Sequence, residues 1–335
     1  MLDRKVLDEK LADGQIGTRL TQQLGIAHPV VSAPMAFAAG GALAAAVSAA
    51  GGMGLIGGGY GDAGWIENQF KVAGNQRIGC GFITWALARQ PQVLEVALAH
   101  RPAALMLSFG DPLPFADQIH AAGVMLICQV QTLAHARAAL AAGAAVIVAQ
   151  GTEAGGHGGR RATLTLVPEV ADMLAAQAPD TLLLAAGGIA DGRGLAAALM
   201  LGADGVLIGS RFWASREALV HPRHHAAALA ADGDGTIRQV ATDAARALDW
   251  PKEYSARVLQ NEFTRRFAGQ EAEKAAELAA YGADYAAAFA AGDPDKAGVW
   301  VGEAVGLISD VPDVAEIMAK IVTGARERLA LGARL

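Results

Sequence analysis

The sequence predicts an α/β fold: a (β/α)8 TIM barrel with a C-terminal helical extension or lid subdomain. Short apolar runs alternate with Ala-rich helical stretches at a spacing of about 20 to 30 residues, which is typical of repeated βα units. Of the 335 residues, 53% are hydrophobic but only 5% are aromatic. The apolar mass is therefore mostly Ala, Leu and Val, which suits a parallel sheet covered by helices on both faces. Because a barrel takes roughly 250 residues, the chain has room for an extension.

Eight apolar runs have the length of strands, and this number favours a closed barrel over an open sheet. The expected strands are 29–35, 53–58, 77–85, 103–110, 124–130, 144–151, 181–188 and 205–210. The stretches between them are expected to be helices, and several begin with Pro, Asp or Thr, which suit a first helical turn. These helices are 41–50, 62–74, 91–100, 114–122, 132–142, 167–178 and 191–201.

The pattern changes after Ser210. Residues 211–335 lack strand signals and are rich in Ala, Glu, Arg and Lys at helical spacing, so they are interpreted as a helical extension. We expect three segments: the main part of the barrel (1–239), a helical subdomain or lid (240–298), and a C-terminal segment that packs back on the barrel (299–335). Helix faces in the extension would serve a homodimer interface or a lid equally well.

One stretch has the length of a membrane span. Residues 29–61 contain no charged residue, and a run of that length can cross a bilayer. However, Pro34 and many glycines interrupt the stretch, and its Ala-rich middle is typical of a short helix between two strands. We therefore predict a β-α-β unit and no membrane partner.

Charge and cysteine content exclude other classes of protein. The net charge is −6 and the Lys and Arg residues are scattered, so nucleic acid is not expected as a partner. Cys80 and Cys128 lie in apolar runs without CxxC spacing, which indicates buried, reduced thiols and no metal site. The N-terminal Met-Leu-Asp-Arg-Lys lacks the apolar segment of a signal peptide, so a cytoplasmic location is expected.

The segment 150–159 follows the sixth expected strand and is the most informative part of the chain. Five of its ten residues are glycine, which lets the backbone approach a planar ligand closely. His157 is the one side chain there that titrates near neutral pH. Its place after a barrel strand favours a catalytic role over a simple hydrogen bond to a backbone carbonyl. Glu153 lies four residues earlier, but on a Gly-rich loop rather than a helix, so the two do not form a preorganised metal site.

Two glycine turns follow the seventh and eighth expected strands. They contain Gly187-Gly188 and Gly209-Ser210, and each precedes an expected helix. Backbone N–H groups at such turns bind phosphate, and a phosphate site after strands 7 and 8 is common in these barrels. Tight turns needed only for barrel geometry are the alternative.

Two weaker signals occur at other strand ends. Ser32-Ala33-Pro34-Met35 forms a rigid turn that could pass along the edge of a flavin ring, and Gln129 offers an amide that both donates and accepts hydrogen bonds. Met35 alone would be interpreted as core filling.

Taken together, these motifs resemble those of the nitronate monooxygenases, formerly called 2-nitropropane dioxygenases, and of the related FMN-dependent enoyl-ACP reductases. The resemblance covers about residues 25–220, with weaker similarity near 299–309. It rests on the order and spacing of four motifs: Ala33-Pro34-Met35, Gly155-Gly156-His157, Ala186-Gly187-Gly188-Ile189 and Gly209-Ser210-Arg211-Phe212.

The resemblance implies FMN as cofactor. It implies that Ala33, Pro34, Met35 and Gln129 contact the flavin ring, that Gly151 and Gly156 lie beside it, and that Gly187, Gly188, Gly209 and Ser210 bind its phosphate. His157 would be the catalytic histidine, acting as a base toward a nitroalkane α-carbon or interacting with the anionic nitronate. The products would be a carbonyl compound and nitrite, with a small-molecule substrate and O2 as partners.

One departure concerns the third expected strand. Many family members carry a flavin-contacting Asn there, whereas this chain has Gly79-Cys80-Gly81-Phe82-Ile83-Thr84-Trp85. Thr84 or Trp85 could shape the substrate side instead, with Ser108 and Asp111 at the same rim. Trp85 would equally serve as core, and Asp111 as a cap of the following turn.

Three function hypotheses follow. The leading one is FMN-dependent oxidation of alkyl nitronates, and of neutral nitroalkanes if they are accepted. The alternatives are an FMN-dependent NAD(P)H reductase of quinones or enoyl thioesters, and a non-catalytic phosphate-ligand-binding barrel. A further cluster, His221, His224 and His225, is interpreted as solvated surface.

Overall fold

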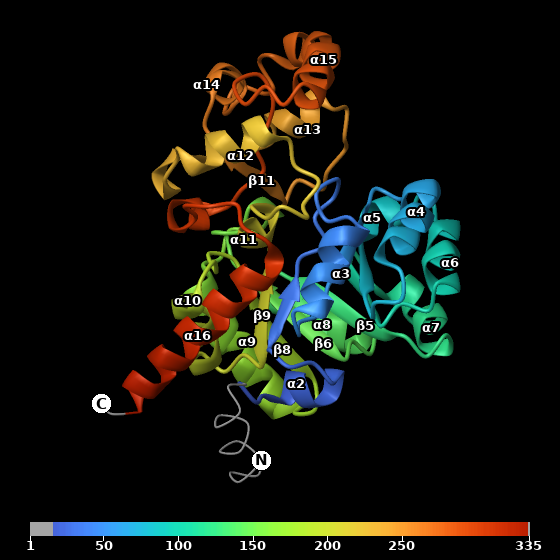
Figure 1. The fold of residues 1–335 in the computed structure, drawn as a ribbon. Coiled ribbons are helices and arrows are strands. Elements are labelled where there is room, and N and C mark those ends of the chain that lie inside the picture. The colour runs from blue at the N-terminus through green and yellow to red at the C-terminus, as the bar shows by residue number, and fades with distance from the viewer. Residues whose placement is uncertain (1–15, 334–335) are drawn as a thin grey trace.

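The computed structural model describes residues 16–333, and its centre is a ring of eight parallel strands (Figure 1). Their order in the sheet is β1-β9-β8-β6-β5-β4-β3-β2. The isolated parallel bridge between Val31 and Met53 joins the two ends and closes the ring. The strands are β1 (Val30–Ser32), β2 (Leu55–Gly59), β3 (Gly79–Ile83), β4 (Ala104–Ser108), β5 (Met125–Val130), β6 (Val146–Gln150), β8 (Leu182–Ala186) and β9 (Gly205–Ile208). All eight expected strands are confirmed, and the fold is a TIM barrel.

Helices between the strands cover the outside of the barrel (Figure 1). Side chains of Asp62, Thr132 and Asp191 cap three of them by accepting backbone N–H groups of the first turn. The short α2 (Arg19–Leu24) puts Leu20 and Leu24 among the apolar side chains inside the barrel. The outer helices are α3 (Gly41–Ala49), α4 (Ala63–Ala73), α6 (Gln92–Ala99), α7 (Leu113–Ala121), α8 (Leu133–Ala141), α9 (Thr163–Gln177) and α10 (Gly192–Met200).

The uncharged stretch 29–61 folds as β1, α3 and β2, so the predicted β-α-β unit is confirmed. Within residues 16–333, no helix has both the length and the apolar character needed to cross a membrane. Cys80 and Cys128 are buried free thiols, and burial raises the pKa of each to about 12. The N-terminal residues on which the cytoplasmic prediction depends lie outside the described part.

The region after Ser210 is mainly helical, as expected. Its helices are α11 (Ser210–Trp213), α12 (Pro222–Leu229), α13 (Ala241–Ala245), α14 (Glu262–Phe267), α15 (Ala275–Ala290) and α16 (Val314–Gly332). In Figure 1, α12 to α15 lie together above one end of the barrel. The last helix packs against α10 and α3, where Gly192 allows the backbones to approach because a side chain there would overlap Gly324 and Ala325.

The expectation that this region lacks strands is wrong. Strands β10 (Thr236–Gln239) and β11 (Ser255–Leu259) pair antiparallel, and β11 also pairs with β7 (Gly156–Gly158). Arg238 and Arg257 lie within these strands, and arginine, which favours helices, obscures the strand pattern there. We propose that residues 240–298 form a subdomain over the barrel mouth, between segments 1–239 and 299–335. The three-stranded sheet joins this subdomain to the barrel segment, because β7 and β10 lie before residue 240 and β11 lies after it.

Candidate active site

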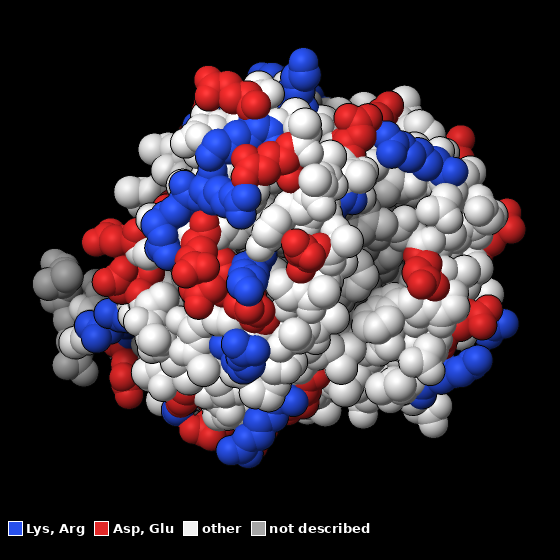
Figure 2. Space-filling view, turned by 90° about the horizontal axis from the view of Figure 1, so that it is seen from above, with Lys and Arg blue, Asp and Glu red and all other residues white. Residues whose placement is uncertain are grey.

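One large cavity of about 1030 Å³ opens where the barrel strands end. Loops after the strands form its floor, and residues of α12, α13 and α15 form its other wall. Figure 2 looks down on the α12–α15 side and shows a recess with mostly uncharged walls. Active sites of TIM barrels lie at this end, and a cavity of this size holds a ligand as large as a cofactor.

His157 lies in the cavity wall on β7, and Asp243 holds its ring. Its Nε2–H donates to Asp243 Oδ2 at 2.8 Å, and both side chains are more than nine-tenths buried. The imidazole also stacks on Trp250, with ring centroids 3.4 Å apart and planes 5° from parallel. No described side chain or backbone group hydrogen-bonds to Nδ1. The pair therefore fixes the ring and leaves Nδ1 to interact with a ligand.

Burial lowers the pKa of His157, while the hydrogen bond and charge of Asp243 act in the opposite direction. The net effect is a lowered pKa, so the imidazole is neutral at physiological pH and its Nδ1 can accept a proton. Asp243 would stabilise the imidazolium that results. The second carboxylate oxygen, Oδ1, is buried without a hydrogen-bond partner among the described residues.

Aromatic side chains gather around this histidine, although they are scarce in the chain as a whole. Trp250 contacts Tyr60, Trp85 and Phe109 edge to face, with centroids between 5.2 and 6.3 Å apart. Trp300 lies 5.7 Å from the imidazole on a separate segment. Such a wall excludes water from the histidine. Trp85 belongs to this cluster, whereas Asp111 caps the next turn by accepting the N–H of Leu113, which confirms the capping alternative.

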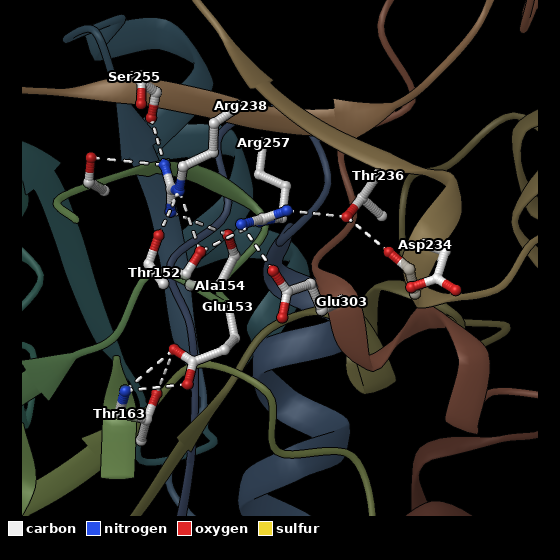
Figure 3. Close-up of polar contacts among 12 residues, drawn as sticks. Thr152, Glu153, Ala154, Thr163, Asp234, Thr236, Arg238, Ser255, Arg257 and Glu303 are labelled. Carbon is white, nitrogen blue, oxygen red and sulfur yellow. Dashed lines mark hydrogen bonds and ion pairs between the residues drawn. The ribbon is translucent and has the colours of Figure 1, made fainter. Parts of the chain in front are cut away.

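Two arginines hold the loop that carries His157 (Figure 3). Arg238 donates to the carbonyl oxygens of Thr152, Ala154, Gly158 and Ser255, at distances from 2.6 to 3.4 Å. Burial and the neighbouring charge of Arg257 lower the pKa of Arg238 to about 10.

Arg257 also donates to the carbonyl of Thr152, and it forms an ion pair with Glu303 at 2.7 Å. Glu153 of the same loop accepts hydrogen bonds from Thr163, as Figure 3 shows. Two carboxylates, Glu153 and Glu303, thus balance the two arginine charges. The arginine hydrogen bonds to Thr152, Ala154 and Gly158 hold the loop 152–158 in place.

The predicted phosphate turns lie together at the cavity. Gly187, Gly188, Gly209 and Ser210 all line it, and Gly187 and Gly188 have φ of 104° and 73°, which favour glycine. Ser210 Oγ accepts the N–H of Gly302 at 2.9 Å, so its own proton is available to a ligand.

The helix ends contribute less to this cradle than expected. Asp191 already caps α10, and α11 is only four residues long. An anion would therefore be held mainly by the turn backbone and the Ser210 hydroxyl.

The predicted flavin contacts also come together, with one exception. Ala33, Pro34, Met35, Gln129 and Gly156 line the same cavity as His157. Gly151 does not, because it packs against other protein groups: a Cβ there would lie 2.0 Å from Thr163 Oγ1.

The unusual third strand has a packing reason. A Cβ on Gly81 would lie 2.3 Å from Pro34 Cγ, so glycine at this position lets the proline turn lie over the strand end. Phe82, Ile83 and Ser108 line the cavity nearby, and no asparagine replaces the missing family contact among the described lining residues.

The interpretation of the histidine cluster as solvated surface is wrong for His224. Its side chain is buried and lines the cavity, and burial lowers its pKa to about 4. The reason is that α12 packs this residue against Phe289 of α15, with centroids 5.7 Å apart. His221 also lines the cavity, whereas His225 Nε2 bonds the carbonyl of Trp213.

Sequence reasoning missed Asp243, Arg246, Trp250 and Trp300, all of which come from the region after the barrel strands. Asp243 stands in the run Ala-Thr-Asp-Ala-Ala-Arg, which looks like an ordinary helical surface. The available signal is the presence of three tryptophans, Trp213, Trp250 and Trp300, in an extension otherwise rich in alanine.

Comparisons with known proteins agree with this geometry. A protein-family model described as nitronate monooxygenase matches residues 80–324. A nitronate monooxygenase of Neurospora crassa is 32% identical, over 90% of this chain and 89% of that protein. FabK from Thermotoga maritima has a TM-score of 0.85 at 30% identity, over 96% of this chain and 100% of that chain. A nitroalkane oxidase from Streptomyces ansochromogenes has a TM-score of 0.76 at 25% identity, over 94% of this chain and 100% of that chain.

Proposed function

The chain belongs to the nitronate monooxygenase family and is an oxidoreductase, and we propose that it catalyses the FMN-dependent oxidation of alkyl nitronates by O2 to a carbonyl compound and nitrite. Its partners would be a small-molecule substrate and O2, and its location the cytoplasm. The observation that carries the proposal is the His157–Asp243 pair, whose free Nδ1 borders a large cavity at the barrel mouth.

The residues present fit FMN. Gly187, Gly188, Gly209 and Ser210 would hold its phosphate, since their backbone and hydroxyl groups line one side of the cavity. Ala33, Pro34, Met35, Gln129 and Gly156 would contact the ring from the strand ends, with Gly151 supporting the loop behind it. When bound, FMN supplies the two-electron redox centre that no side chain provides.

His157 would act at Nδ1. With Nε2–H directed at Asp243, the Nδ1 lone pair can take the α-proton of a neutral nitroalkane, or its protonated form can donate a hydrogen bond to a nitronate oxygen. Trp250 keeps the ring in place by stacking, and the aromatic wall keeps bulk water from competing for the proton.

Nitrite formation by the purified holoprotein tests the proposal. Wild type should form nitrite and a carbonyl compound from a nitronate in air, and His157→Asn should lose most of this activity with FMN still bound. The same flavin content with full activity in the variant would remove His157 from the mechanism. A colourless purified protein that binds no added FMN would refute the cofactor assignment.

A further inference from the structure

Arg246 is the one Lys or Arg among the described residues that line the cavity. It follows α13 directly and lies three residues after Asp243, and residues so spaced lie on one side of a helix. The helix end that supplies the partner of His157 thus also supplies a cation to the same cavity.

Aromatic rings, not carboxylates, surround this cation. The guanidinium carbon lies 5.4 Å from the Tyr60 ring centre, 5.5 Å from that of Trp300 and 6.0 Å from that of Phe37. No ion pair with Asp or Glu involves Arg246 in the described part of the chain. Cation–π contacts orient a guanidinium but leave its in-plane N–H groups free to donate.

The contrast with Arg238 and Arg257 is informative. Figure 3 shows those two arginines directed at carbonyl oxygens and at Glu303, and their role is structural. Within residues 16–333, Arg246 has no such set of acceptors and hydrogen-bonds only with the Tyr60 hydroxyl, although it is half-buried. A half-buried cation without an anionic partner is costly, and an anionic ligand in the cavity would offset that cost.

His157 and Arg246 both approach Trp300, at 5.7 and 5.5 Å from its ring centre. A ligand beside this tryptophan can therefore meet the imidazole and the guanidinium together. The in-plane fork of Arg matches a planar group with two anionic oxygens, which Lys matches less well.

We propose that Arg246 is the substrate-anion site of this enzyme and binds a planar, two-oxygen anion of the nitronate or carboxylate type. In substrate terms this rests on the proposed function, because a nitronate carries such an anion at its reacting end. The same chemistry could come from a carboxylate elsewhere on the substrate, and the second experiment below separates these sources.

The first experiment measures anion binding without turnover. Benzoate and its neutral analogue benzamide are titrated into the holoprotein, and the flavin absorption band is followed per bound flavin. Benzoate should perturb the spectrum of wild type and bind roughly 10- to 100-fold more weakly to Arg246→Met, as expected for loss of a charge-assisted hydrogen bond. Arg246→Lys should bind benzoate with intermediate affinity, and benzamide should not distinguish the variants.

Arg266→Met is the matched control, because Arg266 is an exposed arginine paired with Glu277 and does not line the cavity. It should bind benzoate as wild type does. Equal benzoate affinity in wild type and Arg246→Met, or no benzoate binding by wild type, would overturn the proposal. Because no nitronate is used, these results do not depend on whether nitronates are the substrate.

The second experiment compares KM for a simple alkyl nitronate with KM for a nitronate that carries a distant carboxylate. If Arg246 binds the reacting group, Arg246→Met should raise KM for both nitronates by a similar factor. If it binds a remote carboxylate, only the second KM rises. Unchanged KM for both substrates would overturn the role in substrate binding, and absence of turnover with both in wild type would instead count against the proposed function.

Discussion

The two walls of the cavity differ in origin and in what each contributes. The barrel wall consists of strand-end turns, with Gly187, Gly188, Gly209 and Ser210 on one side and Ala33 to Met35 on the other. The opposite wall consists of β7 and the helices after the barrel, which bring His157, Asp243 and Arg246. In the proposed function, the first wall would hold the cofactor and the second would act on the substrate. Because the two walls come from different parts of the chain, cofactor specificity and substrate specificity can change separately in such a fold.

The largest expected effect is on the second wall. His157→Asn should lower kcat for nitronate oxidation by about 10² to 10³-fold, the usual range for loss of one hydrogen-bond donor to an oxyanion. FMN content should stay at the wild-type level, since the phosphate turns are untouched. Stopped-flow flavin reduction by a nitronate would measure the loss, and a drop in flavin content of similar size would mean that the two walls are not separable.

Asp243→Asn should have the next largest effect. Asp243 raises the pKa of His157 against the lowering effect of burial, so its removal lowers that pKa further. The neutral imidazole then persists to lower pH. With a neutral nitroalkane, whose α-proton the neutral imidazole accepts, the acid limb of the kcat/KM profile should therefore move to lower pH while the plateau falls. Asp249→Asn, a change at an exposed carboxylate that pairs with Arg89, is the control. A profile that moves to higher pH would contradict the assigned role of Asp243.

Arg238→Met should destabilise the contact between the loop 152–158 and the strands β10 and β11, which Arg238 holds together by hydrogen bonds. Loss of the guanidinium leaves carbonyl oxygens of the 152–158 loop without donors, which should cost roughly 2 to 4 kcal/mol in the free energy of unfolding. Chemical denaturation would measure this cost. Arg238→Lys keeps the charge but not the fork, and should recover only part of the stability. Wild-type stability in Arg238→Met would show that the hydrogen bonds from Arg238 to the loop are not needed for stability.

The smallest effect on the folded protein is expected at the phosphate turn. A Cβ on Gly209 would meet Ala33 Cβ at 3.6 Å, an ordinary contact, and the backbone there is not left-handed. Gly209→Ala should therefore leave thermal stability nearly unchanged while weakening FMN binding, because the added methyl group lies in the cradle. Gly188→Ala should lower both thermal stability and FMN affinity, because Gly188 has a φ of 73°. Unaltered FMN affinity in Gly209→Ala would place the phosphate elsewhere.

The barrel wall could be predicted from the sequence because its residues follow directly from strand ends. Once the eight strands are located, Gln129 and the two glycine turns must lie at one rim. His157 could be identified for the same reason. Asp243 could not, because its contact with His157 joins residues 86 positions apart and depends on how α13 lies over the barrel.

Two local errors have similar causes. Gly156-His157-Gly158 has little β propensity, and it becomes a strand because β11 pairs with it. His224 is polar and lies two residues after Pro222, which is typical of an exposed helix start, yet packing of α12 against α15 buries it. In both cases long-range packing overrides local preference.

Anaerobic mixing of the purified holoprotein with a nitronate, and separately with NADH and NADPH, distinguishes nitronate oxidation from flavin reduction by a nicotinamide. The nitronate should bleach the flavin band rapidly, His157→Asn should slow this bleaching, and neither nicotinamide cofactor should bleach it at a comparable rate. Rapid bleaching by NADPH, with no nitrite formed from nitronates in air, would contradict the proposed function and indicate a flavin reductase.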